Sequence, residues 1–482
     1  MTNDISYMYE SKVKVHLSPS STPMYAIVVR FVDGKIEPQF GEVGQMPGSL
    51  FFESGGMEAG VLKVSTGDPA KSDAESYRVA AAAAVKWLRD NHATAASFDL
   101  MPVPPMAVMQ TIPAVVEGLI LGDYQFEAYK TARKERAEVN IELLISAAGK
   151  FEHLASRAQT IARAVCLARD WSHEPANSIN PATLSDWSRK LAEEHKLLFK
   201  ALDYKALEEL GAGALLAVGK GSATPARLIV LEYPGKHPES GDSPIVLVGK
   251  AITFDTGGYS IKNVDSIKGM KFDKSGGIDV IAAVVAASEL QLEQRVVAIV
   301  GAAENSITSD SYKPDDILKT LSGKTVEIAT TDAEGRLVLA DCLTYAQNTY
   351  SPRAIIDVAT LTSAIVTALG KVRAGLFSND DALAGALLDS ASRTHELLWR
   401  MPIDDEYLAG IHSDEADIKN AGIKEGQSIV AAVFLKQFVC PEIPWAHLDI
   451  EGMATTASEL PYSPKGATGF GVRLLLDYIT RL

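Results

Sequence analysis

The sequence predicts an α/β fold with a small N-terminal α/β domain and a larger C-terminal α/β domain, whose central sheet is mostly parallel or mixed and covered by helices. The chain has 482 residues, more than one compact core usually organises, and 47% of them are hydrophobic, enough to fill two cores. From residue 228 onward, strand-like apolar runs alternate with helical patterns, as in sheets with helices on both faces. We therefore place a domain at 1–155, a linker helix and loop at 156–180, and a second domain at 181–482.

The N-terminal domain shows strand and helix patterns but no cluster of chemically active residues. A strand is predicted over 25–31, an alanine-rich helix over 76–90 and a further strand over 141–145. Three prolines between 101 and 109 predict a loop, and 118–138 is predicted to be largely helical. A scaffold or assembly role is the simplest interpretation of this domain.

The elements of the linker and of the C-terminal domain are predicted from the spacing of apolar residues, which differs between helices and strands. A helix is predicted over 156–170, and Thr183 is placed to cap the next helix, which runs to Leu191. The glycine-rich stretch 211–221 lacks dinucleotide spacing and is interpreted as close packing beside a strand. The remaining predicted elements are strands over 228–233, 244–248, 295–300 and 355–358, a helix over 277–290 and a strand-to-helix junction over 326–345.

Charge and composition exclude several classes of protein. A net charge of −15, from 46 Lys and Arg against 61 Asp and Glu, opposes nucleic-acid binding. No apolar segment approaches the ~20 residues that span a bilayer, and the first residues lack the pattern of a signal peptide, so we expect a cytoplasmic protein with no membrane partner. Cys166, Cys342 and Cys440 form no C-x-x-C pair and are expected to be buried thiols in a reducing compartment.

Two carboxylates stand two residues apart where an apolar run ends and a helical pattern begins. In the segment TTDAEGRLVLAD at 330–341, Asp332 and Glu334 precede a glycine and Arg336. Ligands of open α/β sheets bind at the carboxyl ends of strands, and closely spaced carboxylates there can share a hard cation. An isolated pair of this kind is more often a solvated acidic turn.

A second charged junction upstream favours the metal site over the acidic turn. An apolar strand at 245–248 leads into Lys250 and Asp255. Lys262 follows, and Asp273 directly precedes a glycine-rich helix start. No phosphate-binding loop fits, because neither Gly249-Lys250 nor Gly323-Lys324 has the glycine that a Walker loop needs five residues before its Gly-Lys pair. The carboxylates, lysines and arginine of the two junctions together predict a polynuclear metal site with cationic helpers.

In these junctions and in five further segments the chain resembles the leucyl aminopeptidase family, the cytosolic dizinc M17 peptidases. The segments are spread in the family's order through the second half of the chain, whereas the first 150 or so residues carry no comparable motif. They are GKAITFDTGGYSIK at 249–262, MKFDKSGG at 270–277, KPDDIL at 313–318, TTDAEGRLVLAD at 330–341, DVATLTSA at 357–364, SDEADIKN at 413–420, HLDIEG at 447–452 and KGATGFGVR at 465–473.

The resemblance implies a homohexameric, metal-dependent aminopeptidase that releases N-terminal residues from peptides with a free N-terminus. Lys262 would bind the developing oxyanion, and Arg336 would hold a bicarbonate that accepts a proton. Zinc is the implied metal, with manganese, magnesium or cobalt able to substitute. Two such ions would be held by Lys250, Asp255, Asp273, Asp332 and Glu334.

The residues expected to contact substrate include departures from the family's pattern. Ser363 stands for a glycine and Glu451 for an alanine, which predicts a smaller and more polar pocket than one that prefers leucine. Outside the pocket, Thr330 stands for an asparagine and Lys274 for a methionine, and an internal Lys274–Glu451 ion pair is the competing interpretation of Glu451. The implied substrate-binding residues are Met270, Thr360, Leu361, Ser363 and Glu451.

Two functions of other kinds stay open from the sequence. One is a catalytically weak binding or architectural protein of the same fold, and the other is a different dimetal hydrolase, such as a phosphoesterase. The joint presence of Lys250, Lys262 and Arg336 favours the aminopeptidase, because a binding module has no need of all three. Histidine is also more common among the metal ligands of phosphoesterases.

Overall fold

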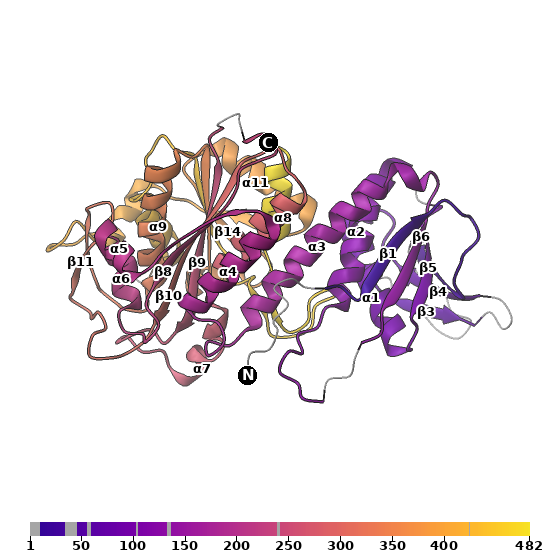
Figure 1. Ribbon diagram of the computed structural model, residues 1–482, viewed down its shortest axis with the longest axis horizontal. Helices are drawn as coiled ribbons and strands as arrows, with labels where there is room; N and C mark the ends of the chain where they lie inside the picture. Colours follow the sequence, from indigo (N-terminus) through magenta and orange to yellow (C-terminus); the bar gives the residue numbers. More distant parts are fainter. Residues whose placement is uncertain are drawn as a thin grey trace. The chain divides into compact units, whose positions relative to one another are not determined.

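The chain divides into two compact units (Figure 1). The computed structural model describes residues 10–33, 46–54, 59–102, 105–132, 136–238, 242–423 and 425–482. The larger unit holds Leu167–Thr455 and Ala467–Leu482, and the smaller unit holds the described part of Met8–Cys166 together with Thr456–Gly466. Helix α3 (Glu152–His173) begins in the smaller unit and ends in the larger one, and the division that we placed at 155 falls near its start.

The smaller unit is built on a six-stranded sheet in the order β1-β6-β5-β2-β4-β3. Neighbouring strands are parallel except β3 and β4, which are antiparallel. The unit also contains helices α1 (Ala74–Asp90) and α2 (Pro105–Asp123) and the short 3₁₀ helix η1 (Ala148–Lys150). Its strands are β1 (Val13–Ser18), β2 (Ile27–Val32), β3 (Leu50–Glu53), β4 (Gly60–Ser65), β5 (Ala95–Asp99) and β6 (Val139–Leu144).

Helix α2 does not follow the bounds that the sequence predicts. Part of the segment expected to be a loop at 101–109 is helical, and the helix expected over 118–138 ends at Asp123. The reason is packing against α1: a Cβ added at Gly118 would lie 2.2 Å from the carbonyl oxygen of Arg78, and one at Gly122 would lie 2.7 Å from the Cα of Ala82. Pro105 is the first residue of the helix, a position that tolerates proline, and close contact with α1 outweighs the cost of Pro113 within the helix.

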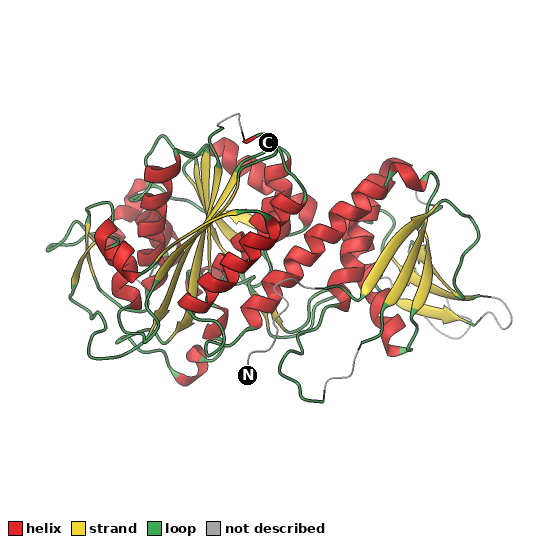
Figure 2. Cartoon of the chain, viewed as in Figure 1, coloured by secondary structure: helices red, strands yellow, loops and turns green. Residues whose placement is uncertain are grey.

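The larger unit is built on an eight-stranded mixed sheet in the order β15-β14-β17-β13-β9-β10-β8-β7. Its four central strands, β17, β13, β9 and β10, are parallel to one another, and helices flank the sheet on both faces (Figure 2). The predicted mixed sheet is therefore confirmed. The strands are β7 (Leu198–Leu202), β8 (Arg227–Tyr233), β9 (Ile245–Asp255), β10 (Val296–Asn305), β13 (Ala354–Ala359), β14 (Ala374–Ser378), β15 (Leu398–Arg400) and β17 (Trp445–Asp449).

The helices of the larger unit connect and cover these strands. They are α4 (Pro181–His195), α5 (Tyr204–Leu210), α6 (Gly213–Gly219), α7 (Val264–Ile267), η3 (Met270–Phe272), α8 (Ser275–Glu289), α9 (Glu334–Tyr350), α10 (Ser363–Leu369), α11 (Asp381–Thr394), η4 (Asp405–Ile411), α12 (Gln427–Lys436) and α13 (Val472–Thr480). A small sheet joins β11 (Ile317–Lys319), β12 (Thr325–Glu327) and β16 (Ile418–Lys419), and β18 (Thr455–Thr456) pairs with β19 (Gly466–Ala467).

Helix α4 begins two residues before the cap that the sequence predicts. Its N-cap is Asn180, whose side chain accepts the N–H groups of Ala182 and Thr183. Thr183 returns the interaction, because its hydroxyl oxygen accepts the N–H of Asn180 at 2.8 Å. Thr183 is therefore the third helical residue of a capping box rather than the cap itself.

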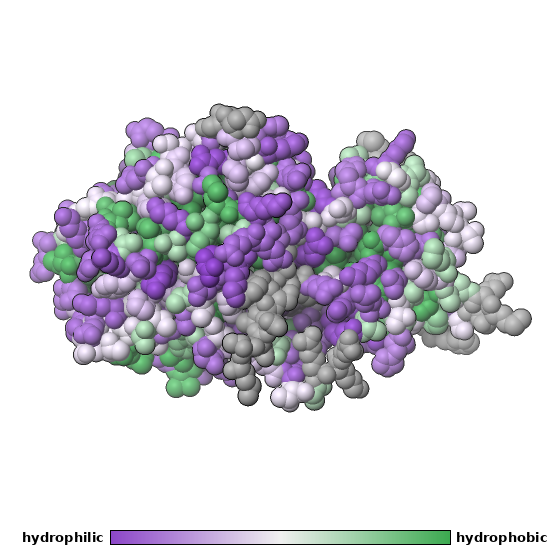
Figure 3. All heavy atoms as spheres, viewed as in Figure 1, coloured by the Kyte–Doolittle hydropathy of each residue, from purple (hydrophilic) through white to green (hydrophobic). Residues whose placement is uncertain are grey.

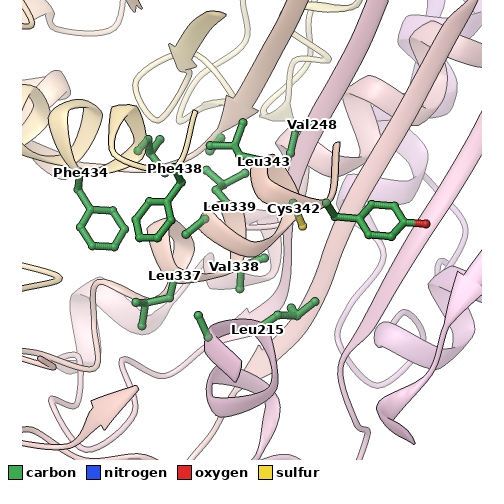
Figure 4. Packing of buried hydrophobic residues seen from close by; sticks show 14 of the residues in the cluster. Leu215, Val248, Leu337, Val338, Leu339, Cys342, Leu343, Phe434 and Phe438 are labelled. Atoms are coloured by element: carbon green, nitrogen blue, oxygen red, sulfur yellow. The ribbon is translucent and has the colours of Figure 1, made fainter. Parts of the chain in front are cut away.

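A buried apolar cluster holds α9 against the sheet. Figure 4 shows Leu337, Val338 and Leu339 of this helix among Leu215 of α6, Val248 of β9, Phe434 of α12 and Phe438. Burial of such side chains stabilises the fold by about 1.5–3 kcal/mol each. Because Glu334 and Arg336 lie in the first turn of α9, this packing also fixes their positions.

Two of the three cysteines are buried, as expected. Cys342 packs within the apolar cluster, and Cys166 is fully covered in α3. Cys440 is exposed, so the expectation of a buried thiol is wrong there. The reason is its place after the end of α12, where its N–H donates to the side chain of Gln347.

No helix in the described part of the chain is long and apolar enough to cross a membrane. Figure 3 shows hydrophilic residues spread over the visible face, with smaller hydrophobic patches between them. Large exposed apolar side chains include Ile261 and Val264, in the segment that connects β9 to α8.

Candidate active site

The predicted site residues gather where the central parallel strands end. Asp255 is the last residue of β9, and Asn305 is the last residue of β10. Thr360 follows β13 directly, and Glu451 lies two residues beyond β17. Because these four strands are parallel, their carboxyl ends share one edge of the sheet, which is where α/β proteins bind ligands.

Three buried carboxylates converge at this edge from three different elements. Asp255, Asp273 and Glu334 each offer an oxygen atom, and these atoms all lie within 4.8 Å of one another. Asp273 directly follows η3, and Glu334 is the first residue of α9. Carboxylates this close repel one another when ionised, unless cations lie between them.

Lys250 lies between two of these carboxylates. Its Nζ is 2.7 Å from Asp273 Oδ1 and 2.9 Å from Glu334 Oε1, and it also donates to the carbonyl oxygen of Thr360 at 2.7 Å. Lys250 belongs to strand β9, and its side chain is 4% exposed. A surface lysine is thereby excluded, and Lys250 belongs to the carboxylate cluster.

Lys262 connects the remaining two carboxylates. Its Nζ lies 2.8 Å from Asp255 Oδ2 and 2.5 Å from Asp332 Oδ1. The side chain of Asp332 is 37% exposed, and it lies at the solvent-facing side of the site, outside the group of three buried carboxylates. The structure thus brings all five predicted metal-binding residues and Lys262 into one network.

The charges of this network shift one another's ionisation. Burial raises the pKa of Asp255 to about 6, and the neighbouring Glu334 adds to this rise. Burial would also raise the pKa of Glu334, but Lys250 and Lys262 outweigh it and hold this pKa below its usual value. Lys250 is buried and Lys262 is half-buried, which favours the neutral amine, yet the surrounding carboxylates raise the pKa values of both above the ordinary range. In the absence of other cations, the lysines are therefore the counter-charges of the site.

Arg336 lies on the same helix as Glu334 and is 7% exposed. Its Nη1 donates to the carbonyl oxygen of Asn420 at 2.6 Å, and its Nε has no hydrogen-bond partner in the part of the chain that the structure describes. Burial lowers the pKa of Arg336 to about 10, although Glu334 and Asp449 oppose this. The guanidinium group therefore keeps a buried donor for a further partner.

The structure explains why a glycine, Gly335, stands between Glu334 and Arg336. A Cβ at this position would lie 2.6 Å from Cε of Lys250 and 2.8 Å from its Nζ. Real Cβ atoms do not approach other atoms so closely, so a larger residue would displace the lysine from the carboxylates. The glycine is thus required by the close approach of Lys250.

The residues predicted to contact substrate differ in what they do. Thr360 is buried, and its hydroxyl donates to Asp273 Oδ1 at 2.7 Å, so it supports the carboxylate cluster. The N–H of Leu361 donates to Asp449 Oδ1 at 3.2 Å. Ser363 is exposed as the first residue of α10, and Met270 is half-buried in η3.

Glu451 lies at this edge of the sheet and does not form the ion pair with Lys274 that was the competing interpretation. Lys274 Nζ donates to the carbonyl oxygens of Ser172 at 2.9 Å and Glu174 at 2.8 Å, and also to that of Lys271. Its three N–H groups are thus used, and no ion pair joins it to Glu451 within the described residues. Burial raises the pKa of Glu451 to about 7, while Lys250 and Lys262 oppose this rise from within the site.

The sequence did not predict two residues that form hydrogen bonds to the carboxylate cluster or to the residue next to it. Asn305 Nδ2 donates to Asp255 Oδ1 at 2.8 Å. Tyr312 donates its hydroxyl to the carbonyl oxygen of Thr331 at 2.8 Å, directly before Asp332. The signal for Asn305 is present in the sequence, because a polar residue ends an apolar strand there as Asp255 does.

A cluster of buried carboxylates and lysines at the carboxyl ends of parallel strands fits the metal site of an enzyme with an α/β fold. Residues 166–476 match the model of the cytosol aminopeptidase family's catalytic domain, and residues 48–133 match that of its N-terminal domain. The chain belongs to the cytosol aminopeptidase (M17) family, and it is a metallo-exopeptidase of the leucyl aminopeptidase type.

Individual relatives agree with this assignment over most of the chain. A "Probable cytosol aminopeptidase" of Syntrophotalea carbinolica is 42% identical over 446 residues, which cover 91% of this chain and 89% of the relative. Another of Geobacter sp. is 44% identical over 425 residues, covering 87% and 85%. Among solved structures, the bottromycin maturation enzyme BotP in complex with Mn has a TM-score of 0.86 at 33% identity and covers 95% of this chain and 99% of its own.

Proposed function

We propose that this aminopeptidase holds two divalent ions on Lys250, Asp255, Asp273, Asp332 and Glu334. The convergence of three carboxylates within 4.8 Å is the observation that carries the proposal. The residues fit such ions: the aspartates and the glutamate offer hard carboxylate oxygens, Lys250 offers an amine nitrogen, and Asp273 Oδ2 has no hydrogen-bond partner in the described part of the chain. Zinc is the proposed metal, with manganese, magnesium or cobalt as substitutes.

Two divalent cations supply Lewis-acid polarisation of the scissile carbonyl and activation of water. The remaining steps belong to the protein's own groups. Lys262, kept protonated by Asp255 and Asp332, donates to the oxyanion that develops on the substrate. Arg336 would hold a bicarbonate that could serve as proton acceptor, and its buried Nε, which has no hydrogen-bond partner among the described residues, supports an anion there. Lys250 serves as a ligand only as a neutral amine, so its proton leaves when cations bind.

The substrates are peptides with a free N-terminus, and we propose that their first side chain is basic or hydrogen-bonding. Support comes from Glu451, which lies beyond β17 at the same sheet edge as Thr360 and has no ion pair with Lys274. A carboxylate there disfavours burial of a leucine side chain. Ser363, exposed at the start of α10, adds a further polar atom near this edge.

The proposed assembly is a homohexamer in the cytoplasm, with residues 1–155 as a scaffold, 156–180 as a linker and 181–482 as the catalytic domain. Support comes from the family alone, whose relatives carry the name cytosol aminopeptidase. Sedimentation of the purified full chain tests the assembly. A monomer at micromolar concentration would contradict it.

Hydrolysis of amino-acid amides and dipeptides, with Zn²⁺ or Mn²⁺ added, tests the proposed function. Activity should vanish with a chelator and return with either ion, because the carboxylates repel one another without cations. Asp332→Asn should lower both metal content and turnover, whereas Asp310→Asn, at an exposed position, should leave both unchanged. Full metal occupancy and normal rates in Asp332→Asn would remove Asp332 from the ligands.

A further inference from the structure

We infer that Asn305 is a positioning residue of the metal site, which fixes one oxygen of Asp255 and leaves the other for the bound ions. The inference rests on the proposed function, because it presumes that Asp255 is a ligand. Asn305 is fully buried at the end of β10 and carries no charge. Its role comes from where the sheet places its amide group.

An irregularity in the sheet brings Asn305 beside Asp255. Strands β9 and β10 pair in one register up to Ala303, which lies opposite Ile252. The register then shifts, so that Asn305 lies opposite Asp255. Irregularities of this kind redirect a side chain and are common next to active sites. In the unshifted register, Asn305 would lie opposite Phe254 instead.

The hydrogen bonds of Asn305 define its orientation. Its Nδ2 donates to Asp255 Oδ1 at 2.8 Å and to the carbonyl oxygen of Thr331 at 3.0 Å. Both partners are acceptors, so the NH₂ group, and not the amide oxygen, must face them. The two donors of one side chain therefore connect the strand that ends in Asp255 to the residue before Asp332.

This arrangement separates the two oxygens of Asp255. Oδ1 accepts the N–H of Gly257 at 2.8 Å as well as the amide of Asn305, so two neutral donors occupy it. Oδ2 faces Lys262 at 2.8 Å, within the cluster. Asn305 thus holds Asp255 with Oδ2 directed at the cations, and it adds no charge to a site already crowded with carboxylates.

Thr331, the second partner of Asn305, also forms hydrogen bonds with other residues. The carbonyl oxygen of Thr331 also accepts the hydroxyl of Tyr312 at 2.8 Å, and the Thr331 hydroxyl donates to the carbonyl oxygen of Gly257 at 2.6 Å. Asn305 therefore sets the separation between two ligand-bearing segments. Groups that orient metal ligands in this way change metal affinity or activity by about 10- to 100-fold when they are removed.

The test measures binding of Mn²⁺ alone to the metal-free full chain by titration calorimetry, together with the thermal unfolding of the metal-free protein. Asn305→Ala removes the amide, and Asn305→Leu removes it while keeping the side-chain volume. Asn379→Ala is the control, because the exposed Asn379 side chain also makes two hydrogen bonds in the same unit, with the backbone of Ile443 and Trp445. We expect both Asn305 variants to bind Mn²⁺ about 10- to 100-fold more weakly, and the control to bind normally.

Several results would overturn the inference. Wild-type affinity in both Asn305 variants would overturn the role of Asn305 alone, and an equal loss in Asn379→Ala would show a general effect of destabilisation. If neither Asn305 variant folds without metal, the residue is structural and the inference fails. Absence of Mn²⁺ binding by the wild-type chain would overturn the proposed metal site, and the role of Asn305 with it.

Discussion

The ammonium group of Lys274 lies 2.8 Å from the carbonyl oxygen of Glu174, a residue 100 positions earlier in the chain. Together with the carbonyls of Ser172 and Lys271, this contact fills the donors of a lysine that is fully buried. Burial lowers its pKa to about 7, with Lys271 adding to the effect. Lys274 therefore connects the C-terminal end of α3 to the start of α8, and it supplies no counter-charge to Glu451.

The first prediction concerns Glu451, which forms no ion pair with Lys274. Glu451→Ala should shift the preferred first residue from basic or polar side chains toward Leu and Met, because the cost of burying an apolar side chain beside a carboxyl group is removed. Profiling with a panel of amino-acid amides measures the change, and Glu459→Ala, at an exposed position, is the control. An unchanged profile, or a wild-type chain that already favours Leu strongly, would show that Glu451 does not face the substrate.

A second prediction concerns Lys262, which contacts Asp255 and Asp332. Lys262→Ala should leave the metals bound and lower turnover by about 10² to 10³, the usual effect of losing one oxyanion donor. Metal analysis and kcat on the same samples separate the two effects. Lys268→Ala, exposed in the same connecting segment, should behave as wild type. Loss of metal from Lys262→Ala would assign the lysine to metal binding instead.

Replacement of Asp341 tests how α9 is anchored. Its two oxygens accept the N–H groups of Leu321 at 2.8 Å and Leu215 at 2.9 Å, and the side chain is fully buried. In Asp341→Asn one oxygen becomes an NH₂ group that faces a backbone donor, so stability should fall by about 1–3 kcal/mol. Burial raises the pKa of Asp341 to about 7, so urea unfolding at pH 8, above that value, measures the effect. Asp389→Asn on the exposed face of α11 should cost nothing, and an equal loss in both would reject the role of Asp341.

Asp279 should make stability depend on pH. It is buried in α8, neither of its oxygens has a hydrogen-bond partner among the described residues, and burial, followed by the charge of Glu396, raises its pKa well above the ordinary value. The folded state therefore keeps the proton that the unfolded chain loses near pH 4. Above that pH, the contribution of Asp279 to stability should fall by up to about 1.4 kcal/mol per pH unit until its folded-state pKa is reached.

Comparison of wild type with Asp279→Asn checks this sign. The stability of the wild-type chain relative to the variant should decline between pH 5 and pH 7, because the variant has no proton to lose. Unfolding in urea at both pH values gives the difference, and Asp389→Asn serves as the exposed control. If the difference in unfolding free energy between wild type and variant stayed constant across this range, Asp279 would have the same protonation in the folded and the unfolded state.

Local sequence alone determined the elements that carry the chemistry. The change from an apolar run to a helical pattern placed Asp332 and Glu334 at a junction before α9, and the end of an apolar strand placed Asp255. These features depend on hydrophobic period and on residues a few positions apart, which a sequence displays directly. The family's motifs added which charged residues act together.

Only the tertiary structure decided which groups meet. Lys274 contacts Glu174 and not Glu451, and Asn305 reaches Asp255 through a shift in strand register. Helix α2 continues through Pro113 because it packs closely on α1. Each of these results depends on contacts between segments far apart in the chain, and packing overrides local propensity where large areas are buried. Local patterns therefore fix the end of a strand, whereas the side chain that faces it depends on how the strands pair and the helices pack.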